Sequence, residues 1–417
     1  MKVSGLPYTK SSRFDRRGHN PKRKVTMRFL IQIPQLIYGG AEKVLVNFAD
    51  ELVSRGHDVT VLEIYEKGFL KPQFDSRVHF DAICSREYTE KYYASLSDIK
   101  AEKAFAKKLR KCCKLAFSKL VGYRRFAEKL AAKRYADEHF DVAVNYLETE
   151  PPDFLLKHIK AEKYIQWYHT DVANLDDPKD TDRLIPHILR MDNLICVSEA
   201  AGHSFAARYP QLSEKIRVLY NFFDAGAIKE AAAVPFSYPA GGTVLLSVGR
   251  MTEQKKYLRF LDVLAMLERE GIDFQWHVLG DGYQLEEIEA RIGELGLGGR
   301  VFLDGVTDNP YKYMKNCDLF VLPSGWEGFP TVTVEAKLLG CPVLATDVSG
   351  IREQLTHGET GWIVENNETA IYEGLKQLLL HPELRESLRS TEGMERICDN
   401  TEKYREFMEM CDGRKQA

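Results

Sequence analysis

Several features that mark common classes of protein are missing from this sequence of 417 residues. Its charges nearly cancel, with 58 Lys and Arg against 61 Asp and Glu, which argues against a dedicated nucleic-acid-binding protein. The 8 cysteines form neither a CxxC pair nor a metal-binding spacing, so we expect buried thiols in a reducing cytosol. We therefore predict a globular protein with no nucleic-acid partner.

Long hydrophobic runs are also missing. No stretch of about 18 apolar residues is present, so the sequence predicts no transmembrane helix. The apolar segment MRFLIQIPQLIY follows a basic start, but polar residues and Pro34 interrupt it, and no small-residue cleavage site follows it. We therefore expect a disordered basic extension over residues 1–26 rather than a signal peptide, and a cytoplasmic location.

The sequence does contain a repeated alternation of short apolar runs and helical segments. A break rich in Pro, Gly and Ala, AAAVPFSYPAGG, separates RFLIQIP, HDVTVLEIY, FDVAVNYL and NLICVS from TVLLSVGR, FQWHVLGDG, DLFVLPS and CPVLATDVSG. Near-continuous hydrophobic strands that end in Gly- or Ser-rich loops are typical of doubly wound parallel sheets. We therefore predict an α/β fold with Rossmann-like domains at 27–222 and 223–390 and a C-terminal segment at 391–417.

The segment WEGFPTVTVEAKLLG places Glu327 and Glu335 eight positions apart around a run of β-branched residues. It lies between two predicted parallel strands, which need a crossover connection that is usually a helix. We therefore predict a helix here, with Pro330 in its first turn and Gly340 at its C-terminal stop. A helix that begins at the carboxyl end of a parallel strand favours a phosphate at its N-terminus.

A carboxylate repels a diphosphate, so carboxylates at this place are expected to bind another part of the ligand. An ionised carboxylate only accepts hydrogen bonds and can bind two hydroxyl groups at once. We assign Glu335 to a ribose and Glu327 to the transferred sugar; the alternative is that both are solvated surface charges. Arg250 and Lys255 in SVGRMTEQKK would balance the diphosphate without a metal, unless this segment is an ordinary polar loop.

In the first domain, GGAE opens a predicted helix, and Gly39 and Gly40 would let a ligand approach the backbone closely. The full GxGxxG pattern is missing, so a binding site for NAD is not supported. His169 in QWYHTD follows an apolar run, at a strand end that faces the cleft; a purely structural role is the alternative. Asp171 either orients His169 or caps the next helix. The LGDG at 279–282 predicts a tight turn beside the crevice.

Together, GGAEKV, WYHTD, VSEAA, VLYN, SVGRMTEQKK, LGDG and EGFPTVTVE leading into ATDVSGIRE resemble the GT-B retaining nucleotide-sugar glycosyltransferases of family four. That group includes bacterial capsule and exopolysaccharide enzymes. The resemblance covers about residues 28–380. It implies two Rossmann-like domains that face a central cleft, retention of the anomeric configuration, and neither metal nor other cofactor. One departure is Lys256, where relatives usually have Gly.

The resemblance also implies a role for each matching residue. Arg250, Lys255, Glu327 and His169 would act at the reacting centre, with His169 reaching the sugar from the N-terminal domain. The implied donor-binding residues are Gly39, Gly40, Arg250, Lys255, Glu327, Gly328, Phe329, Pro330, Thr331 and Glu335. The C-terminal segment TEKYREFMEMC would cross back to the first domain.

Residues 100–134 carry thirteen Lys and Arg against two Glu. Apolar and small residues share one face of the predicted helix: Phe105, Leu109, Cys112, Ala116 and Leu120. Either this helix packs on the sheet with a solvated basic face, or it binds an anionic lipid surface.

The predicted function is retaining transfer of a hexose or N-acetylhexosamine from a nucleotide sugar to a lipid-linked glycan in surface polysaccharide synthesis. UDP is the expected nucleotide, with GDP-mannose left open, and the inner face of the membrane is the expected place. One alternative is a GT-B epimerase or phosphorylase, although no attachment motif for pyridoxal phosphate is present. The other is a non-catalytic protein that binds nucleotide sugars.

Overall fold

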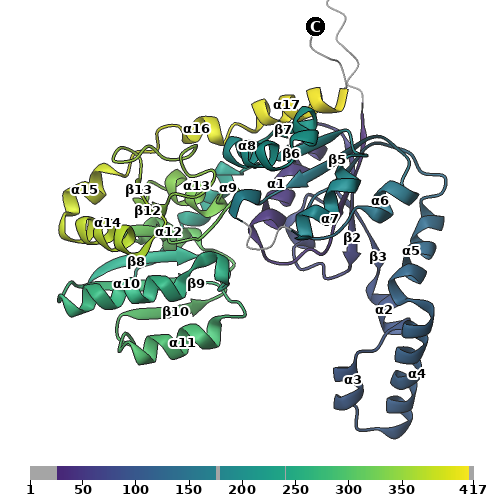
Figure 1. The fold of residues 1–417 in the computed structure, drawn as a ribbon, viewed down its shortest axis with the longest axis horizontal. Helices are drawn as coiled ribbons and strands as arrows, with labels where there is room; N and C mark the ends of the chain where they lie inside the picture. Colours follow the sequence, from purple (N-terminus) through teal and green to yellow (C-terminus); the bar gives the residue numbers. More distant parts are fainter. Residues whose placement is uncertain (1–25, 175–178, 240, 413–417) are drawn as a thin grey trace, which may run out of the picture.

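The computed structural model describes residues 26–174, 179–239 and 241–412. The predicted extension at 1–26 therefore lies outside the described residues, apart from its last position. The described chain forms two lobes side by side, each with a parallel sheet between layers of helices (Figure 1).

The N-terminal lobe contains a seven-stranded sheet in the order β3-β2-β1-β4-β5-β6-β7. Its strands are β1 (Arg28–Ile33), β2 (Asp58–Tyr65), β3 (His79–Cys84), β4 (Phe140–Asn145), β5 (Ala161–Tyr168), β6 (Asn193–Cys196) and β7 (Ile216–Val218). All pairings are parallel, and Leu30 of β1 lies between Thr60 of β2 and Ala143 of β4. The strand order reverses between β1 and β4, which opens a crevice at their carboxyl ends.

The C-terminal lobe repeats this plan with six parallel strands in the order β10-β9-β8-β11-β12-β13. They are β8 (Thr243–Val248), β9 (Phe274–Leu279), β10 (Val301–Gly305), β11 (Leu319–Leu322), β12 (Val343–Thr346) and β13 (Trp362–Val364). The order reverses between β8 and β11, so this lobe also has a crevice at its strand ends. The prediction of an α/β fold with two doubly wound domains is confirmed.

Helices cover both sheets. Those up to the end of the first sheet are α1 (Gly40–Ser54), α2 (Arg86–Tyr92), α3 (Leu96–Ala101), α4 (Phe105–Val121), α5 (Tyr123–Arg134), α6 (Asp153–His158), α7 (Lys179–Ile188) and α8 (Glu199–Arg208). The later helices are α9 (Ala225–Ala232), α10 (Tyr257–Arg269), α11 (Leu285–Glu294), α12 (Tyr311–Asn316), α13 (Thr331–Leu338), α14 (Glu368–Leu380), α15 (Pro382–Ser387), α16 (Met394–Ile397) and α17 (Asn400–Asp412). Short 3₁₀ turns are η1 (Lys71–Gln73), η2 (Val172–Asn174), η3 (Pro210–Lys215) and η4 (Glu253–Lys255).

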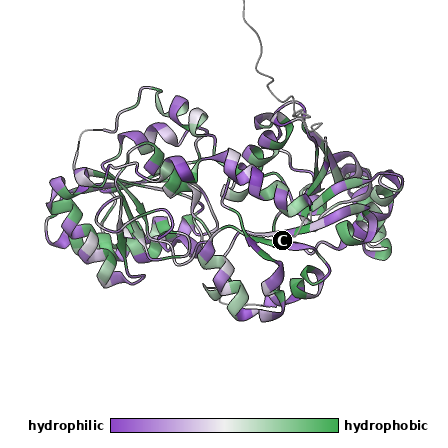
Figure 2. Ribbon diagram, turned by 90° about the horizontal axis from the view of Figure 1, so that it is seen from above, coloured by the Kyte–Doolittle hydropathy of each residue, from purple (hydrophilic) through white to green (hydrophobic). Residues whose placement is uncertain are grey.

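The two sheets form the cores of the lobes because their strands are apolar on both faces. Every residue of β9 is buried, including Phe274 and Trp276, which expose none of their surface. Hydrophobic colouring follows the central strands of both lobes in Figure 2. Because the strands are apolar, the polar side chains stand in the loops at the strand ends, where the crevices lie.

Two of the sets of contacts that join the lobes lie outside the crevices. The Glu353 carboxylate of the C-terminal lobe accepts hydrogen bonds from the first amides of α8, at 2.9 and 3.0 Å, where the helix dipole also favours an anion. Helix α17 lies against the N-terminal lobe, with Tyr404 Oη 2.7 Å from His57 Nε2 and the Phe407 ring 4.9 Å from that of Phe48. These contacts hold the two crevices against each other.

Helices α3 and α4 form an arm that extends away from the body of the N-terminal lobe (Figure 1). The predicted apolar face of α4 is uncovered: Phe105 is 82% and Leu120 89% exposed. The interpretation that residues 100–134 pack on the sheet is therefore wrong for α4. It holds for α5, which packs beside β3, where Arg134 pairs with Asp81 at 3.0 Å. None of the helices in the described ranges combines the length and apolar character that a membrane span needs.

Candidate active site

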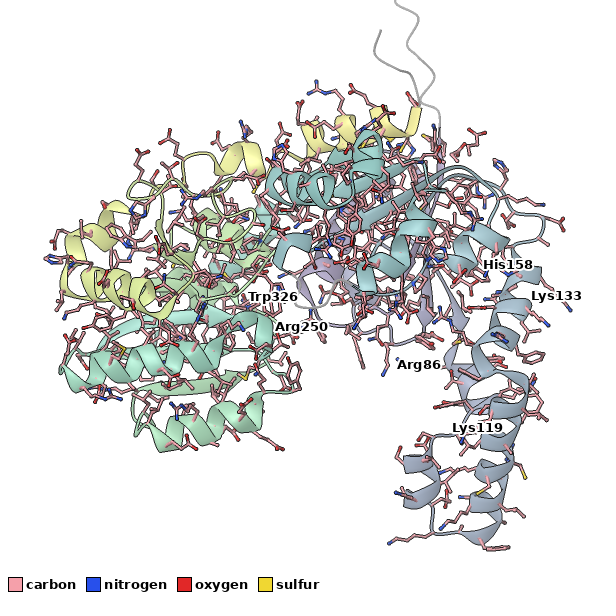
Figure 3. The ribbon with its side chains drawn as sticks, in the orientation of Figure 1. Arg86, Lys119, Lys133, His158, Arg250 and Trp326 are labelled. Carbon is pink, nitrogen blue, oxygen red and sulfur yellow. The ribbon has the colours of Figure 1, made fainter. Side chains whose placement is uncertain are left out.

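A cavity of about 950 Å³ separates the carboxyl ends of the two sheets and is lined by both lobes. Two helices begin at this cavity, α1 from the first lobe and α13 from the second. Their first turns face each other, because a Cβ on Gly40 would lie 3.4 Å from Thr331 Oγ1. Figure 3 shows Arg250 and Trp326 at the junction of the lobes. Two helix N-termini directed at one space favour an anionic ligand.

The β-branched segment after Glu327 forms helix α13, as predicted from the crossover between β11 and β12. Pro330 takes the N-cap position, and Gly340 adopts the left-handed conformation that ends a helix. Gly328 lies so close to the first lobe that a Cβ there would be 2.1 Å from the carbonyl oxygen of His169. Glycine at 328 is therefore required for the lobes to meet beside the cavity.

Glu327 and Lys255 form an ion pair inside the cavity. Lys255 Nζ lies 2.7 Å from Glu327 Oε1, and their side chains are only 13% and 9% exposed. Ser324 Oγ donates to the same oxygen at 2.7 Å, and Gln254 Nε2 donates to Oε2 at 3.2 Å. Three donors thus fix the carboxylate, which a solvated surface charge would not require.

Arg250 lies at the end of β8 on a loop that the LGDG segment supports. The amide of Met251 donates to the Asp281 carbonyl at 2.9 Å, and a Cβ on Gly280 would lie 2.0 Å from the Gly249 oxygen. The two loops are therefore in backbone contact, which only glycine permits. Arg250 is exposed at the cavity and has no ion pair with any residue of the described ranges.

Glu335 lies one turn inside α13 and is 5% exposed. Its Oε1 is 3.3 Å from Lys43 Nζ of helix α1, and Tyr311 Oη donates to the same atom at 3.3 Å. Lys43 Nζ also lies 4.4 Å above the Tyr311 ring. Burial and the neighbouring carboxylate raise the pKa of Tyr311, which keeps its hydroxyl protonated as a donor. With Glu327 also buried, the interpretation of these two glutamates as surface charges is wrong.

His169 lines the cavity from the end of β5. Burial lowers its pKa to about 3, although a hydrogen bond between Nε2 and the Tyr146 carbonyl at 3.0 Å opposes the shift. A neutral ring whose Nε2–H donates to Tyr146 leaves Nδ1 as an acceptor. Asp171 does not orient it: one carboxylate oxygen accepts from the Ala173 amide at 2.8 Å, and the other accepts from Ser349. Asp171 thus caps the next turn and ties the lobes together.

Three further carboxylates line the cavity from the first lobe, and one of them, Glu150, pairs with Arg124 at 2.8 Å. Glu42, at the start of α1, is 7% exposed, and Glu148 follows β4. Burial raises the pKa of Glu42 and of Glu148. Hydrogen bonds from their own amides limit both shifts, as do the charge of Arg250 for Glu42 and hydrogen bonds from Thr170 and His169 for Glu148. Gly39 and Gly40 begin this helix, and a Cβ on Gly39 would lie 2.2 Å from Glu42 Oε2.

Lys256, the departure from the family pattern, has φ 51° and ψ 36°. Among the described residues it is the only non-glycine side chain with a positive φ. Lys256 thus adopts a left-handed conformation that glycine takes readily, and Lys255 is directed into the cavity.

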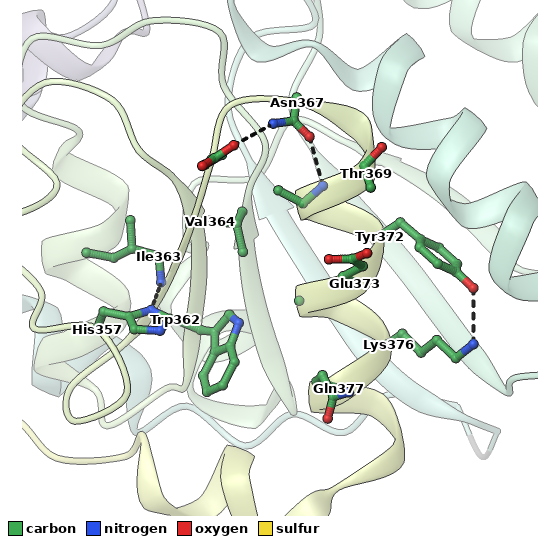
Figure 4. Close-up of a pocket in the computed structure, with 13 residues that line it drawn as sticks. His357, Trp362, Ile363, Val364, Asn367, Thr369, Tyr372, Glu373, Lys376 and Gln377 are labelled. Carbon is green, nitrogen blue, oxygen red and sulfur yellow. Dashed lines mark hydrogen bonds between the residues drawn. The ribbon is translucent and has the colours of Figure 1, made fainter.

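A second hollow of about 930 Å³ lies between β13 and α14 on the C-terminal lobe (Figure 4). Its polar groups mostly bind one another: the Ile363 amide donates to His357 Nδ1 at 3.1 Å, and Lys376 Nζ lies 3.1 Å from Tyr372 Oη. None of the predicted site residues lines it. We therefore place the active site in the cavity between the lobes.

The structure brings most of the predicted residues to this one cavity. Those that line it are Gly39, Gly40, His169, Arg250, Lys255, Glu327, Gly328, Phe329, Pro330, Thr331 and Glu335. Sequence reasoning missed Lys43, Tyr311, Glu42 and Glu148. Glu42 and Lys43 stand within the GGAEK motif, so the motif could have indicated them. Glu148 and Tyr311 belong to segments with no distinguishing pattern. Glu148 lines the cavity and Tyr311 contacts Glu335, and only the fold brings either of them there.

Two facing doubly wound lobes with a ligand cavity between their strand ends define the GT-B class of fold. The model for glycosyltransferase family 4 matches residues 38–226, and that for glycosyl transferases group 1 matches residues 232–392. The chain belongs to the GT-B glycosyltransferases of this family.

Curated relatives match part of the chain. The N-acetylgalactosamine-N,N'-diacetylbacillosaminyl-diphospho-undecaprenol 4-alpha-N-acetylgalactosaminyltransferase of Campylobacter jejuni is 35% identical over 179 residues, which are 42% of this chain and 48% of that protein. The lipopolysaccharide core biosynthesis glycosyltransferase LpsE of Rhizobium meliloti is 28% identical over 52% of this chain and 62% of its own length. The match with the first relative thus spans about half the length of that protein.

Solved structures share the fold over nearly the whole chain. HepE of Anabaena, in complex with UDP, has a TM-score of 0.67 and 16% identity over 94% of this chain and 100% of its own. TarM of S. aureus, in complex with fondaparinux, alpha-GlcNAc-glycerol and UDP, has a TM-score of 0.72 and 14% identity over 93% of this chain and 100% of its own.

Proposed function

We propose that this protein is a retaining glycosyltransferase that moves a hexose or N-acetylhexosamine from a UDP-linked sugar to a lipid-linked glycan in surface polysaccharide synthesis. The observation that carries the proposal is the convergence of Arg250, Lys255, Glu327 and Glu335 at the N-terminus of α13 in one cavity. UDP is favoured because HepE and TarM are described as complexes with UDP. The lipid-linked acceptor is favoured by the diphospho-undecaprenol in the name of the Campylobacter relative.

The proposed chemistry uses groups that the cavity already holds. The diphosphate would lie at the amides of Gly328 and Thr331 beside Arg250 and Lys255, which balance its charge as the sugar departs, without a metal. Glu335 would accept from the ribose hydroxyls, and Glu327 from the transferred sugar. The acceptor hydroxyl would attack on the face that the diphosphate leaves, and the leaving phosphate oxygen would take its proton.

A nucleotide and nucleotide-sugar panel tests the proposal. UDP at 100 times its dissociation constant would add about 2.7 kcal/mol to the free energy of unfolding, and GDP at the same concentration should add less. A transferase consumes donor mainly when an acceptor is added, whereas an epimerase converts donor alone and a binding protein converts nothing. A product with inverted anomeric configuration, or an epimerised donor formed without acceptor, would contradict the proposal.

We also propose that residues 100–134, through the part of them that forms the arm, place the enzyme on anionic lipid, where a lipid-linked acceptor is presented. The arm extends from the body of the lobe, and Figure 3 shows Lys119 on it, well away from His158. Its apolar face is uncovered while its cations Lys107, Lys108 and Arg110 are exposed. An exposed apolar face bordered by cations fits a membrane surface, where each cation contributes about 1 kcal/mol.

Co-sedimentation with anionic and neutral vesicles tests the arm. Changing Lys107, Lys108 and Arg110 to Glu should abolish binding to anionic vesicles. Lys111 and Lys114 are left unchanged, because Lys111 pairs with Glu102 at 3.0 Å and Lys114 donates to the Glu90 carbonyl.

The matched control reverses three exposed cations of the C-terminal lobe, Lys229, Arg269 and Lys315, and should bind as the wild type does. Binding should also weaken at 1 M salt, where the screening length is about 3 Å. A version that begins at Met27 separates any contribution of the basic N-terminus. Equal binding by the arm variant and the control would contradict a role for the arm.

A further inference from the structure

Glu42 is a buried carboxylate that the proposed chemistry does not use. It lies at the start of α1, lines the cavity from the N-terminal lobe and is 7% exposed. Within the described ranges no side chain donates a hydrogen bond to it or pairs with it; its hydrogen bond is with its own backbone amide. Nearly all buried polar side chains have partners, so a buried carboxylate that faces a cavity with no partner beyond its own amide indicates a ligand group.

Glu148, the neighbouring carboxylate, has a different task. Its Oε1 accepts from Thr170 Oγ1 at 2.8 Å and its Oε2 from the His169 amide at 3.2 Å. It therefore holds the loop that carries His169 and has few lone pairs left for a ligand. Glu42 is the carboxylate of this wall that remains open.

The position of Glu42 determines which substrate it meets. Four of the side chains assigned to the donor, Arg250, Lys255, Glu327 and Glu335, belong to the C-terminal lobe, whereas the N-terminal lobe presents the Gly39 and Gly40 backbone and His169 to the donor. Glu42 belongs to the opposite wall, and its strongest favourable charge interaction is with Arg250 across the cavity. When a diphosphate binds Arg250, it neutralises the positive charge that stabilises the buried Glu42 carboxylate. A hydrogen-bond donor from the substrate would then stabilise this carboxylate in its place.

The chemistry of a carboxylate limits what that donor is. An ionised carboxylate accepts hydrogen bonds and repels phosphates and other carboxylates. Its Oε2 also lies over Gly39, at the amides where an incoming anion would otherwise bind. The substrate group at this place must therefore be uncharged or cationic, and it must donate.

We propose that Glu42 binds a hydroxyl group of the acceptor sugar and orients the acceptor towards the departing diphosphate. The proposal rests on the proposed glycosyl transfer. Glu42 is then an acceptor-binding residue. Acceptor sugars that carry a phosphate on the carbon next to the hydroxyl bound by Glu42 are excluded, because the carboxylate would repel the phosphate.

The experiment compares wild type, Glu42→Gln and a control, Glu51→Gln. Glu51 lies on the same helix but at its other end, where it pairs with Arg55 at 2.7 Å away from the cavity. Three quantities are measured: UDP affinity by calorimetry, hydrolysis of UDP-glucose, UDP-galactose and their N-acetylhexosamine counterparts without acceptor, and transfer to a short-chain prenyl-diphosphate N-acetylhexosamine.

Glu42→Gln should retain UDP affinity and donor hydrolysis within about threefold, and it should lose about 10- to 100-fold in kcat/KM for the acceptor, as loss of a hydrogen bond to a charged group does. Glu51→Gln should match the wild type in all three. Equal losses in hydrolysis and transfer would assign Glu42 to the donor and overturn the proposal, as would unchanged transfer. Wild-type protein that binds no UDP and converts no donor would instead overturn the proposed function, and this inference with it.

Discussion

The ammonium of Lys255 lies 2.7 Å from the carboxylate of Glu327, and neither side chain exposes more than 13% of its surface. One residue comes from the loop after β8 and the other from the loop before α13. The pair therefore connects the proposed diphosphate site to the proposed sugar site. A diphosphate that binds Lys255 competes with Glu327 for the positive charge of the ammonium group. The assignment of Lys255 to the diphosphate and that of Glu327 to the sugar therefore depend on each other.

The first prediction concerns this pair in the free protein. Lys255→Met leaves Glu327 buried without its cation and should lower the free energy of unfolding by about 3 kcal/mol, as removal of one partner from a buried ion pair does. Glu327→Gln in the same protein should restore much of that loss. Denaturant unfolding of the two single variants and the double variant measures the coupling; purely additive effects would contradict it.

The second prediction concerns Arg250. Because it is the exposed cation closest to the proposed diphosphate, Arg250→Ala should reduce turnover by about 100-fold or more at saturating donor. Stability should change little, since Arg250 has no ion pair among the described residues. Arg269→Ala, which removes an exposed cation from the end of α10, is the matched control. Near wild-type turnover in the Arg250 variant would remove this residue from the site.

The third prediction separates the two glutamates. Glu335→Gln should mainly raise the KM for the donor, because contact with a ribose persists from ground state to transition state. Glu327→Gln should mainly lower kcat, because its contact strengthens as positive charge develops on the sugar ring. Steady-state kinetics with varied donor distinguish these cases. The opposite pattern would mean that the two roles are exchanged.

Much of this fold could be predicted from the sequence because both sheets are buried on both faces. Continuous apolar strands that end in glycine, and one β-branched segment between two of them, sufficed to predict two doubly wound lobes and helix α13. The same reasoning predicted that Glu327 and Glu335 face a ligand. These features depend on local pattern and on chain connectivity, which a single sequence displays directly.

The contacts across the cavity could not be predicted in this way. Lys43 meets Glu335 only because the two lobes close on each other, and Tyr311 joins them from a segment without a motif. The arm was also ambiguous, since an apolar face on a basic helix is compatible with packing on a sheet or with exposure. Long-range packing decides such cases, and periodicity carries no information about it.

The fourth prediction concerns the pH dependence of stability at His169. Its pKa is about 3 in the folded protein and 6.5 in the unfolded chain. The folded state therefore binds fewer protons between these values, and stability present above pH 6.5 is lost as the pH falls, by at most about 1.4 kcal/mol per unit. His169→Gln cannot titrate, so its unfolding free energy should fall less between pH 6.5 and 5. Parallel curves for the two proteins would show that folding does not lower the pKa of His169.

The last prediction concerns the backbone at Lys256. A residue with a side chain in the left-handed region is less stable there than glycine by about 1 kcal/mol. Lys256 also pairs with Glu253 at 2.5 Å and lies over the Trp326 ring at 5.4 Å, so replacement removes side-chain contacts as well as strain. Comparing Lys256→Gly with Lys256→Ala cancels the lost contacts, and the glycine variant should be more stable than the alanine variant by about 1 kcal/mol in denaturant unfolding. The same exchange at Lys315, within helix α12, should favour alanine by a similar amount, because glycine is the poorer helix former. If alanine is preferred at both positions, the turn does not hold Lys256 in the left-handed conformation, and Lys255 is positioned by its ion pair with Glu327 alone.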